Sequence, residues 1–75
     1  MADRRLQVFH TVARLMSFTK AAEALHMTQP AVTFQVRQLE EQFNTRLFDR
    51  GRHRISLTDA GNRVFEYADR IFALY

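Results

Sequence analysis

The sequence predicts a mainly α-helical domain of the winged helix-turn-helix type, with three core helices, a two-stranded wing and a long C-terminal linker helix. Three observations support this fold class. Apolar residues recur every three or four positions along most of the chain, as they do on helix faces. Thr28 and Pro30 mark a helix start only a few residues after a short helical segment. Two short, partly alternating apolar stretches flank Gly51, which is typical of a hairpin.

Composition limits the chain to one small folded domain. It has 75 residues, 47% of them hydrophobic and 25% charged, and it has no cysteine for a disulfide or a thiolate zinc site. No stretch approaches the roughly 18 successive apolar residues of a membrane span, and the first residues lead into no signal-peptide core. We therefore expect a cytoplasmic protein without a membrane partner. The net charge of +3 points only weakly to nucleic acid, and the position of the charges matters more.

The first predicted helix runs from Asp3 to Met16 and carries two apolar stripes. The stripe expected to enter the core consists of Leu6, Phe9, Ala13 and Met16. The stripe on the far side consists of Val8, Val12 and Leu15. Because a small domain offers only one core, we expect the second stripe to need another packing partner.

Two closely spaced helices follow. Ser17-Phe18-Thr19 supplies polar cap candidates for the strong helix formers of residues 20–25. His26-Met27 then turns the chain toward Thr28, which can cap the next helix with Pro30 inside its first turn. Two helices separated by so few residues form a helix-turn-helix.

The faces of the third helix, residues 28–43, can be assigned from spacing. The buried stripe is expected to contain Val32, Val36, Leu39 and Phe43. The opposite side carries Pro30, Phe34, Arg37 and Glu41, with Thr33 and Gln38 on its flanks. Near the start of this helix, Gln29, Thr33 and Phe34 lie beside Arg37. These hydrogen-bonding, methyl-bearing and cationic groups suit base edges, a thymine methyl and phosphate in a major groove.

The predicted wing, residues 46–57, concentrates the positive charge. Asn44 can end the third helix in the left-handed conformation, and Gly51-Arg52-His53 joins the segments 46–50 and 54–57. Four of the eleven Lys and Arg residues lie in this wing, opposed only by Asp49: Arg46, Arg50, Arg52 and Arg54. A tip formed by Arg52, His53 and Arg54 could follow the DNA backbone or enter a narrow minor groove.

The last helix begins at Thr58-Asp59, which can cap its first turn, and runs to the end of the chain. Its apolar surface exceeds what a terminal helix needs to cover one core and matches the surplus on the first helix. We therefore expect a homodimer. The expected interface consists of Val8, Val12, Leu15, Val64, Phe65, Ala68, Ile71, Phe72 and Tyr75.

Other functional classes have weaker support. His10 lies near the apolar face of the first helix, as a histidine at the edge of the core would, and His26 and His53 are isolated, so no metal site is expected. The chain lacks a nucleophile paired with a base, an evident carboxylate pair and a phosphate-binding glycine loop, which argues against an enzyme. The alternative is a winged-helix protein-interaction module, which predicts no salt-dependent affinity for DNA.

Several sequence blocks resemble the N-terminal DNA-binding domain of LysR-type transcriptional regulators. The blocks are residues 18–25, 28–33, 39–40, 46–50 and 57–61, and their order and spacing are family-like across essentially the whole chain. The resemblance implies a bacterial regulator whose last helix pairs two subunits on DNA with interrupted palindromic half-sites. It also implies no cofactor in this chain, because a small-molecule co-inducer would bind a C-terminal domain that the chain lacks.

The resemblance also implies where DNA lies. It places Gln29, Pro30, Thr33 and Phe34 at the DNA-facing start of the recognition helix, with Arg50 and residues 52–54 in the wing. The family position of Phe34 is often polar or basic, so here we expect apolar contact with a thymine methyl or a sugar. Asn44 stands where the family often has glycine. The complete set of expected DNA contacts is Thr28, Gln29, Pro30, Ala31, Thr33, Phe34, Arg37, Arg50, Arg52, His53 and Arg54.

These expectations divide the chain into two functional parts. Residues 1–58 form the DNA-binding domain, and residues 59–75 form the linker and dimerisation helix. The protein is expected to be cytoplasmic and associated with the nucleoid when it is bound to promoter DNA.

Overall fold

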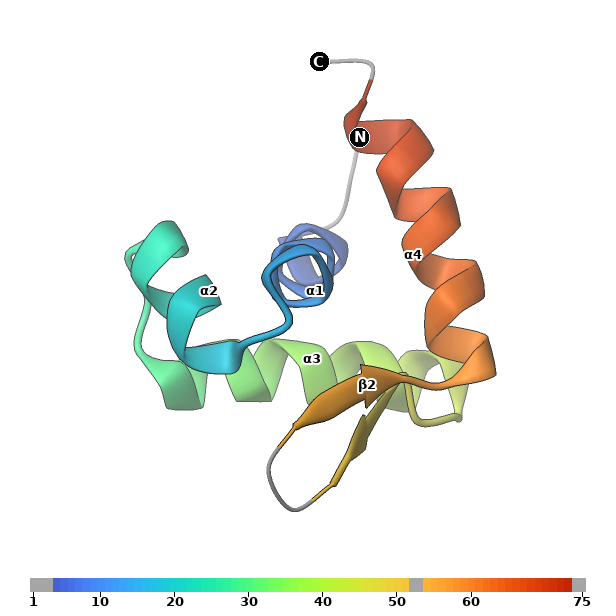
Figure 1. Cartoon of the computed structure of the whole chain (residues 1–75), viewed down its shortest axis with the longest axis horizontal. Coiled ribbons are helices and arrows are strands. Elements are labelled where there is room, and N and C mark those ends of the chain that lie inside the picture. Colours follow the sequence, from blue (N-terminus) through green and yellow to red (C-terminus); the bar gives the residue numbers. More distant parts are fainter. Residues whose placement is uncertain (1–3, 52–53, 74–75) are drawn as a thin grey trace.

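The computed structural model describes residues 4–51 and 54–73. Its elements are α1 (Arg4–Leu15), α2 (Phe18–Leu25), α3 (Gln29–Phe43), β1 (Phe48–Arg50), β2 (Ile55–Leu57) and α4 (Asp59–Phe72). Helix α1 runs through the middle, α2 and α4 flank it, α3 crosses below it, and the hairpin projects beyond α3 (Figure 1). The predicted winged helix-turn-helix architecture is confirmed. Within the described ranges, no helix has the length and apolar character needed to cross a membrane.

Polar caps and left-handed residues set the helix boundaries. The hydroxyls of Ser17, Thr28 and Thr58 each accept a backbone N–H three residues ahead, at 3.0, 3.2 and 3.0 Å. His26 and Asn44 end α2 and α3 with a φ of 55°. The caps expected at Thr28 and Thr58 and the helix end at Asn44 are therefore confirmed.

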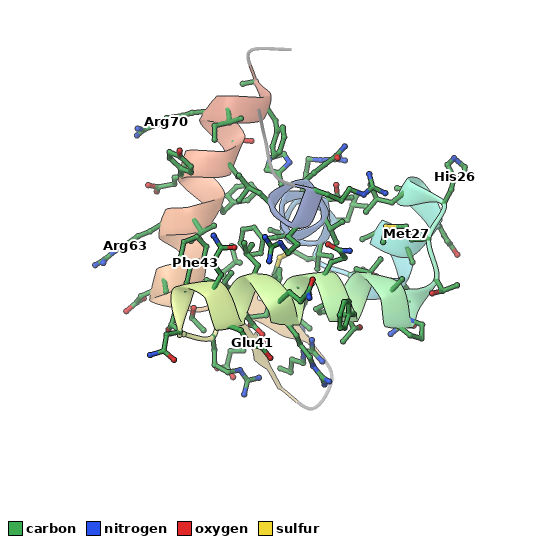
Figure 2. The ribbon with its side chains drawn as sticks, turned by 180° about the vertical axis from the view of Figure 1, so that it is seen from behind. His26, Met27, Glu41, Phe43, Arg63 and Arg70 are labelled. Carbon is green, nitrogen blue, oxygen red and sulfur yellow. The ribbon has the colours of Figure 1, made fainter. Side chains whose placement is uncertain are left out.

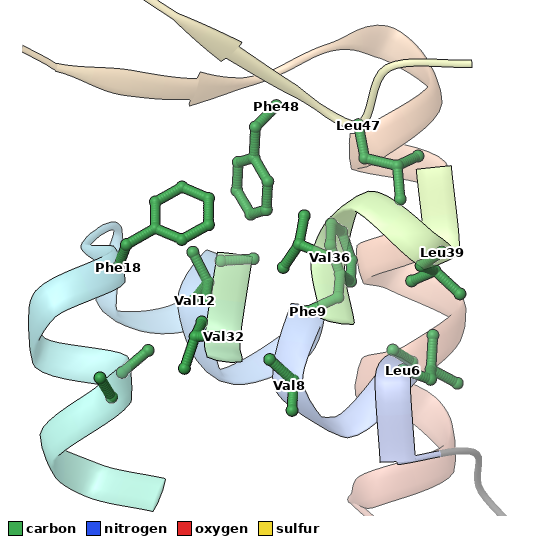
Figure 3. Packing of buried hydrophobic residues seen from close by; sticks show 14 residues of the cluster. Leu6, Val8, Phe9, Val12, Phe18, Val32, Val36, Leu39, Leu47 and Phe48 are labelled. Carbon is green, nitrogen blue, oxygen red and sulfur yellow. The ribbon is translucent and has the colours of Figure 1, made fainter. Parts of the chain in front are cut away.

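An aromatic cluster joins the hairpin to the helices. The ring of Phe48 in β1 lies 5.2 Å from that of Phe9 in α1 and 5.5 Å from that of Phe18 in α2, between ring centroids. Figure 3 shows Phe48 reaching from the strand toward these rings and Val36 of α3. The wing is thus anchored in the same hydrophobic core that holds the three helices together.

Both apolar stripes of α1 enter this core. Val8, Phe9 and Val12 are fully buried, and Leu6 and Ala13 are nearly so. The expectation that Val8 and Val12 form a surplus stripe for a second subunit is therefore wrong. The reason is that α2, α3 and α4 all pack against α1, so one helix is covered on several sides within a single chain (Figure 1). Leu15 is partly buried and packs against the same core.

Two residues expected in the core are exposed instead. Met16 follows the last residue of α1 and takes a φ of 52°, which ends the helical direction before its side chain can join the stripe. Phe43 is the last residue of α3, where the helix has passed beyond α1 and reaches the base of α4 (Figure 2). Spacing alone shows neither where a helix ends nor how far a neighbouring helix covers it.

The junction between the wing and α4 is closely packed. The Thr58 hydroxyl donates to the carbonyl oxygen of Arg46 at 2.7 Å, and the Thr58 N–H donates to that of Leu47 at 3.0 Å. Gly61 is buried against the same segment, and a Cβ atom at this position would overlap the carbonyl oxygen of Leu47. This position therefore needs glycine because the two backbones approach closely.

Gly61→Ala is expected to lower the free energy of unfolding by about 3 kcal/mol, because the new methyl group must displace the backbone at Leu47. Urea unfolding followed by circular dichroism measures the change. The matched control is Asn62→Ala at the next, exposed position of α4, which should stay within about 0.5 kcal/mol of the parent chain. Equal stability of the two variants would contradict this account of the junction.

Candidate nucleic-acid interface

The start of α3 forms an exposed surface, the candidate reading surface. Gln29, Pro30, Thr33, Phe34 and Arg37 together line a hollow of about 420 Å³. The Phe34 side chain is 58% exposed although it is apolar. The structure thus gathers on one face the residues that spacing assigned to it. The face offers an amide, a hydroxyl, an aromatic ring and a guanidinium, which are the groups that read base edges and phosphates.

Thr28 and Ala31, at the start of α3, are the other two residues of this region that were predicted to contact DNA. The Thr28 hydroxyl accepts the backbone N–H of Ala31, so this N–H is already occupied by the cap. Thr28 is exposed and Ala31 is partly buried. Thr28 therefore shapes the helix start, and its own hydroxyl proton is still available as a donor.

A residue of α2 contacts the reading surface. The Thr19 hydroxyl donates to Oε1 of Gln29 at 3.3 Å. Thr19 is not predictable from the sequence as part of this surface, because its proximity to Gln29 depends on the angle between α2 and α3 and not on spacing along the chain. The contact limits the rotation of the Gln29 amide.

Glu40 of α3 fixes the start of the wing. Its Oε2 atom accepts the N–H groups of Leu47 and Phe48, at 2.8 and 3.3 Å. This role of Glu40 was not predicted from the sequence; the only signal for it is an acidic side chain near the start of the wing. One carboxylate oxygen thereby ties the wing to the reading helix.

The wing is a short antiparallel hairpin. Phe48 pairs with Leu57, and Arg50 pairs with Ile55. The N–H of Gly51 donates to the carbonyl oxygen of Arg54 at 2.9 Å, which closes the described part of the turn. Arg54 is exposed, whereas Arg52 and His53, also expected to contact DNA, lie outside the described residues.

The arginine side chains extend the reading surface toward the wing. The guanidinium carbon of Arg50 lies 4.5 Å from the ring centroid of Phe18, in a cation–π contact with α2. Arg50 also lines a second hollow, of about 480 Å³, with Arg37 and Arg46 between α3 and the wing. Because Arg37 lines both hollows, the basic groups continue from the reading surface into the groove beside the wing. Glu40 and Glu41 also line this groove, so its charge is mixed.

Helix α4 carries its apolar residues in two stripes. Phe65 and Phe72 lie against the His10 ring of α1, with centroids 5.3 and 5.0 Å away. Ala68 lies on this inner side and is fully buried, so the expectation that it faces a second subunit is wrong. His10 itself is confirmed as a histidine at the edge of the core, with its side chain 12% exposed.

The outer stripe of α4 follows the spacing i, i+4, i+7 and i+11. It consists of Ala60, Val64, Tyr67 and Ile71. Ala60, Val64 and Ile71 are partly buried at the edge of the core, whereas Tyr67 is 61% exposed. Tyr67 was not among the residues predicted for the interface, although its helical spacing from Val64 and Ile71 indicates that it shares their face. Tyr75, the last residue expected at the interface, lies outside the described residues.

Comparison with known proteins gives consistent matches. Residues 4–62 match the family described as "Bacterial regulatory helix-turn-helix protein, lysR family". The chain is 52% identical over 68 residues to the HTH-type transcriptional regulator CfxR of Cupriavidus necator, covering 91% of this chain and 22% of that protein. Identity to the RuBisCO operon transcriptional regulator of Allochromatium vinosum is also 52%, with the same coverage of both chains. The chain thus spans about a fifth of the length of the curated relatives it matches.

Solved structures share the same fold. The chain matches the BenM_DBD/catB site 1 DNA complex with a TM-score of 0.90 and 34% identity, covering 97% of this chain and 82% of that one. It matches the CbnR_DBD–DNA complex with a TM-score of 0.87 and 38% identity, covering 99% and 85%.

Glu40→Ala is expected to lower the free energy of unfolding by about 1–3 kcal/mol, because it leaves two backbone N–H groups at the start of the wing without their acceptor. Thermal and urea unfolding measure the loss. Glu41→Ala is the matched control, since Glu41 is adjacent and exposed, and it should change stability by at most about 0.5 kcal/mol. If both variants lost the same stability, the two hydrogen bonds would not hold the wing.

Proposed function

Because the chain belongs to the lysR family of bacterial regulatory helix-turn-helix proteins, we propose that it binds promoter DNA sequence-specifically as the DNA-binding domain of a transcriptional regulator. The observation that carries this proposal is the exposed surface at the start of α3, which continues into the arginine-lined groove beside the wing. Similar domains in the BenM and CbnR complexes are bound to DNA, which supports the proposal. We place this activity in the cytoplasm, on the nucleoid.

The recognition helix, residues 28–43, enters the major groove with its first turns. Gln29 can hydrogen-bond to base edges, and the Thr33 methyl and the Phe34 ring can contact a thymine methyl. The partial positive charge of the helix start favours a phosphate nearby. Discrimination between sequences is thus assigned to the exposed start of α3.

The wing, residues 46–57, follows the DNA backbone or the adjacent minor groove. Arg54 is exposed on it, and Arg37, Arg46 and Arg50 line the groove between the wing and α3. These cations attract phosphates whatever the base sequence, and this attraction weakens as the salt concentration rises. Affinity and salt dependence are therefore assigned to the arginines and specificity to α3.

Fluorescence anisotropy with a labelled interrupted palindrome and a scrambled duplex, across a salt series, tests this division. Tight binding to the palindrome that falls steeply with salt is expected. Thr33→Ala should cost about 1–3 kcal/mol chiefly on the palindrome, because a base contact is lost. Arg54→Ala should weaken binding to both duplexes, because a phosphate contact is lost.

The controls separate the competing outcomes. Arg14→Ala removes an exposed arginine of α1 and should leave both affinities close to those of the parent chain. Equal losses on both duplexes for Thr33→Ala and Arg54→Ala would contradict the division of roles. Absence of binding to any DNA at low salt would favour a protein-interaction module on the same fold.

Two copies of the chain pair through the linker helix, residues 59–75. The outer stripe of α4 supports this arrangement, because Val64, Tyr67 and Ile71 present an apolar row that the protomer's own core leaves partly uncovered. A symmetric dimer would place two recognition helices on the half-sites of an interrupted palindrome. The small-molecule co-inducer expected for this family belongs to a separate effector domain of the longer regulators.

Ile71→Glu is expected to abolish dimerisation, because it places a charge in the outer stripe of α4. Ile71 also packs against the core, so circular dichroism first establishes that the variant is folded. Sedimentation velocity over a concentration series, with and without the palindrome, measures the dimer fraction. Asn62→Glu adds the same side chain on the opposite, exposed face of α4 and should leave that fraction unchanged. A dimer that survives Ile71→Glu would place the interface elsewhere.

A further inference from the structure

A single histidine joins α4 to the centre of the domain. His10 Nε2 lies 3.0 Å from Asp69 Oδ1. The same ring is stacked on Phe65, with an interplanar angle of 14°, and meets the Phe72 ring at 47°. His10 thus contacts three residues that span two turns of α4.

The two partners differ in exposure. The His10 side chain is 12% exposed, whereas the Asp69 side chain is 60% exposed. An ion pair or hydrogen bond to so exposed a carboxylate adds little to stability. Its geometric effect is larger, because a ring packed on two sides and hydrogen-bonded at its nitrogen permits only a narrow range of orientations.

The position of this contact along α4 determines how strongly it can restrict the direction of the helix. The first turn of α4 is fixed at Thr58 and Gly61, against the segment that starts the wing. The 14 residues of α4 span about 21 Å at about 1.5 Å per residue. Farther along, buried Ala68 and the contacts of Phe65, Phe72 and Asp69 with His10 hold α4 against α1. If the His10 contacts loosen, a tilt of about 10° moves the far end of α4 by about 3.6 Å, close to one base-pair step of DNA.

We infer that His10 is a positioning residue for DNA recognition: through Asp69, Phe65 and Phe72 it fixes the direction of α4 relative to the reading helix α3. In the dimer this direction sets the separation of the two recognition helices, and therefore the half-site spacing that the protein prefers. The second statement rests on the proposed pairing through α4. The first concerns one chain only.

Distance measurements within one chain test the first statement. Because the chain has no cysteine, Glu23→Cys on α2 and Arg70→Cys on α4 provide a unique pair of spin-label sites on helices that flank α1 (Figures 1 and 2). Asp69→Ala should broaden the measured distance distribution, because His10 loses its acceptor. Glu66→Ala removes another exposed carboxylate of α4 and should leave the distribution unchanged.

A conservative variant distinguishes a specific effect of the His10–Asp69 contact on α4 from a general loosening of the helix. Asp69→Asn retains a side-chain oxygen that can accept from His10 and should keep the narrow distribution. A distribution that stays unchanged in Asp69→Ala would overturn the inference. Equal broadening in Glu66→Ala would also overturn it, because the effect would then not depend on His10.

Binding to a series of palindromes whose half-sites differ in separation by one base pair tests the second statement. Asp69→Ala should reduce the preference for the best spacing about two- to fivefold, the scale of an exposed ion pair, without changing affinity for a single half-site. An unchanged spacing preference together with a broadened distance distribution would refute the role of His10 in half-site spacing. If the parent chain itself showed no spacing preference, the proposed dimer would fail, and the spin-label distances would still decide whether His10 fixes α4.

Discussion

The burial of α1 is the constraint on which the rest of the structure depends. A chain of 75 residues has one core, and Val8, Phe9 and Val12 fill its centre from a single helix. Helices α2, α3 and α4 all pack on α1, so each takes its position from the same element. The surface assigned to DNA on α3 and the surface assigned to the partner on α4 are therefore placed by one common support. A change in the packing of α1 would alter the relation between them.

Polar contacts add direction to this apolar packing. Glu40 binds two backbone N–H groups at the start of the wing, and Arg50 lies over the Phe18 ring at the start of α2. Hydrophobic burial alone is non-directional. Hydrogen bonds and a cation–π contact restrict the wing to one orientation beside α3. This explains how a hairpin with strands of only three residues each can hold its arginines next to the reading helix.

Sequence reasoning succeeded where the cause is local. The caps at Thr28 and Thr58 and the left-handed end at Asn44 follow from properties of single residues and their neighbours. The exposed face of α3 follows from helical periodicity alone. The contact between Thr19 and Gln29 does not, because it depends on how two helices cross. The second stripe of α1, Val8 and Val12, was misassigned for the same reason: periodicity shows which residues share a face but not how many neighbours cover the helix.

The division of α4 into two stripes has a consequence for assembly. The inner stripe is already packed against His10 and α1, so only a few side chains centred on Tyr67 are left for a partner. Stable interfaces bury at least about 1,200 Å² in total, and a short helix pair with few free apolar residues falls below this. Binding to adjacent half-sites, as proposed, would hold two copies at a high effective concentration. For this chain, dimerisation and occupation of a palindrome should therefore be thermodynamically linked, with DNA supplying much of the free energy that pairs the two α4 helices.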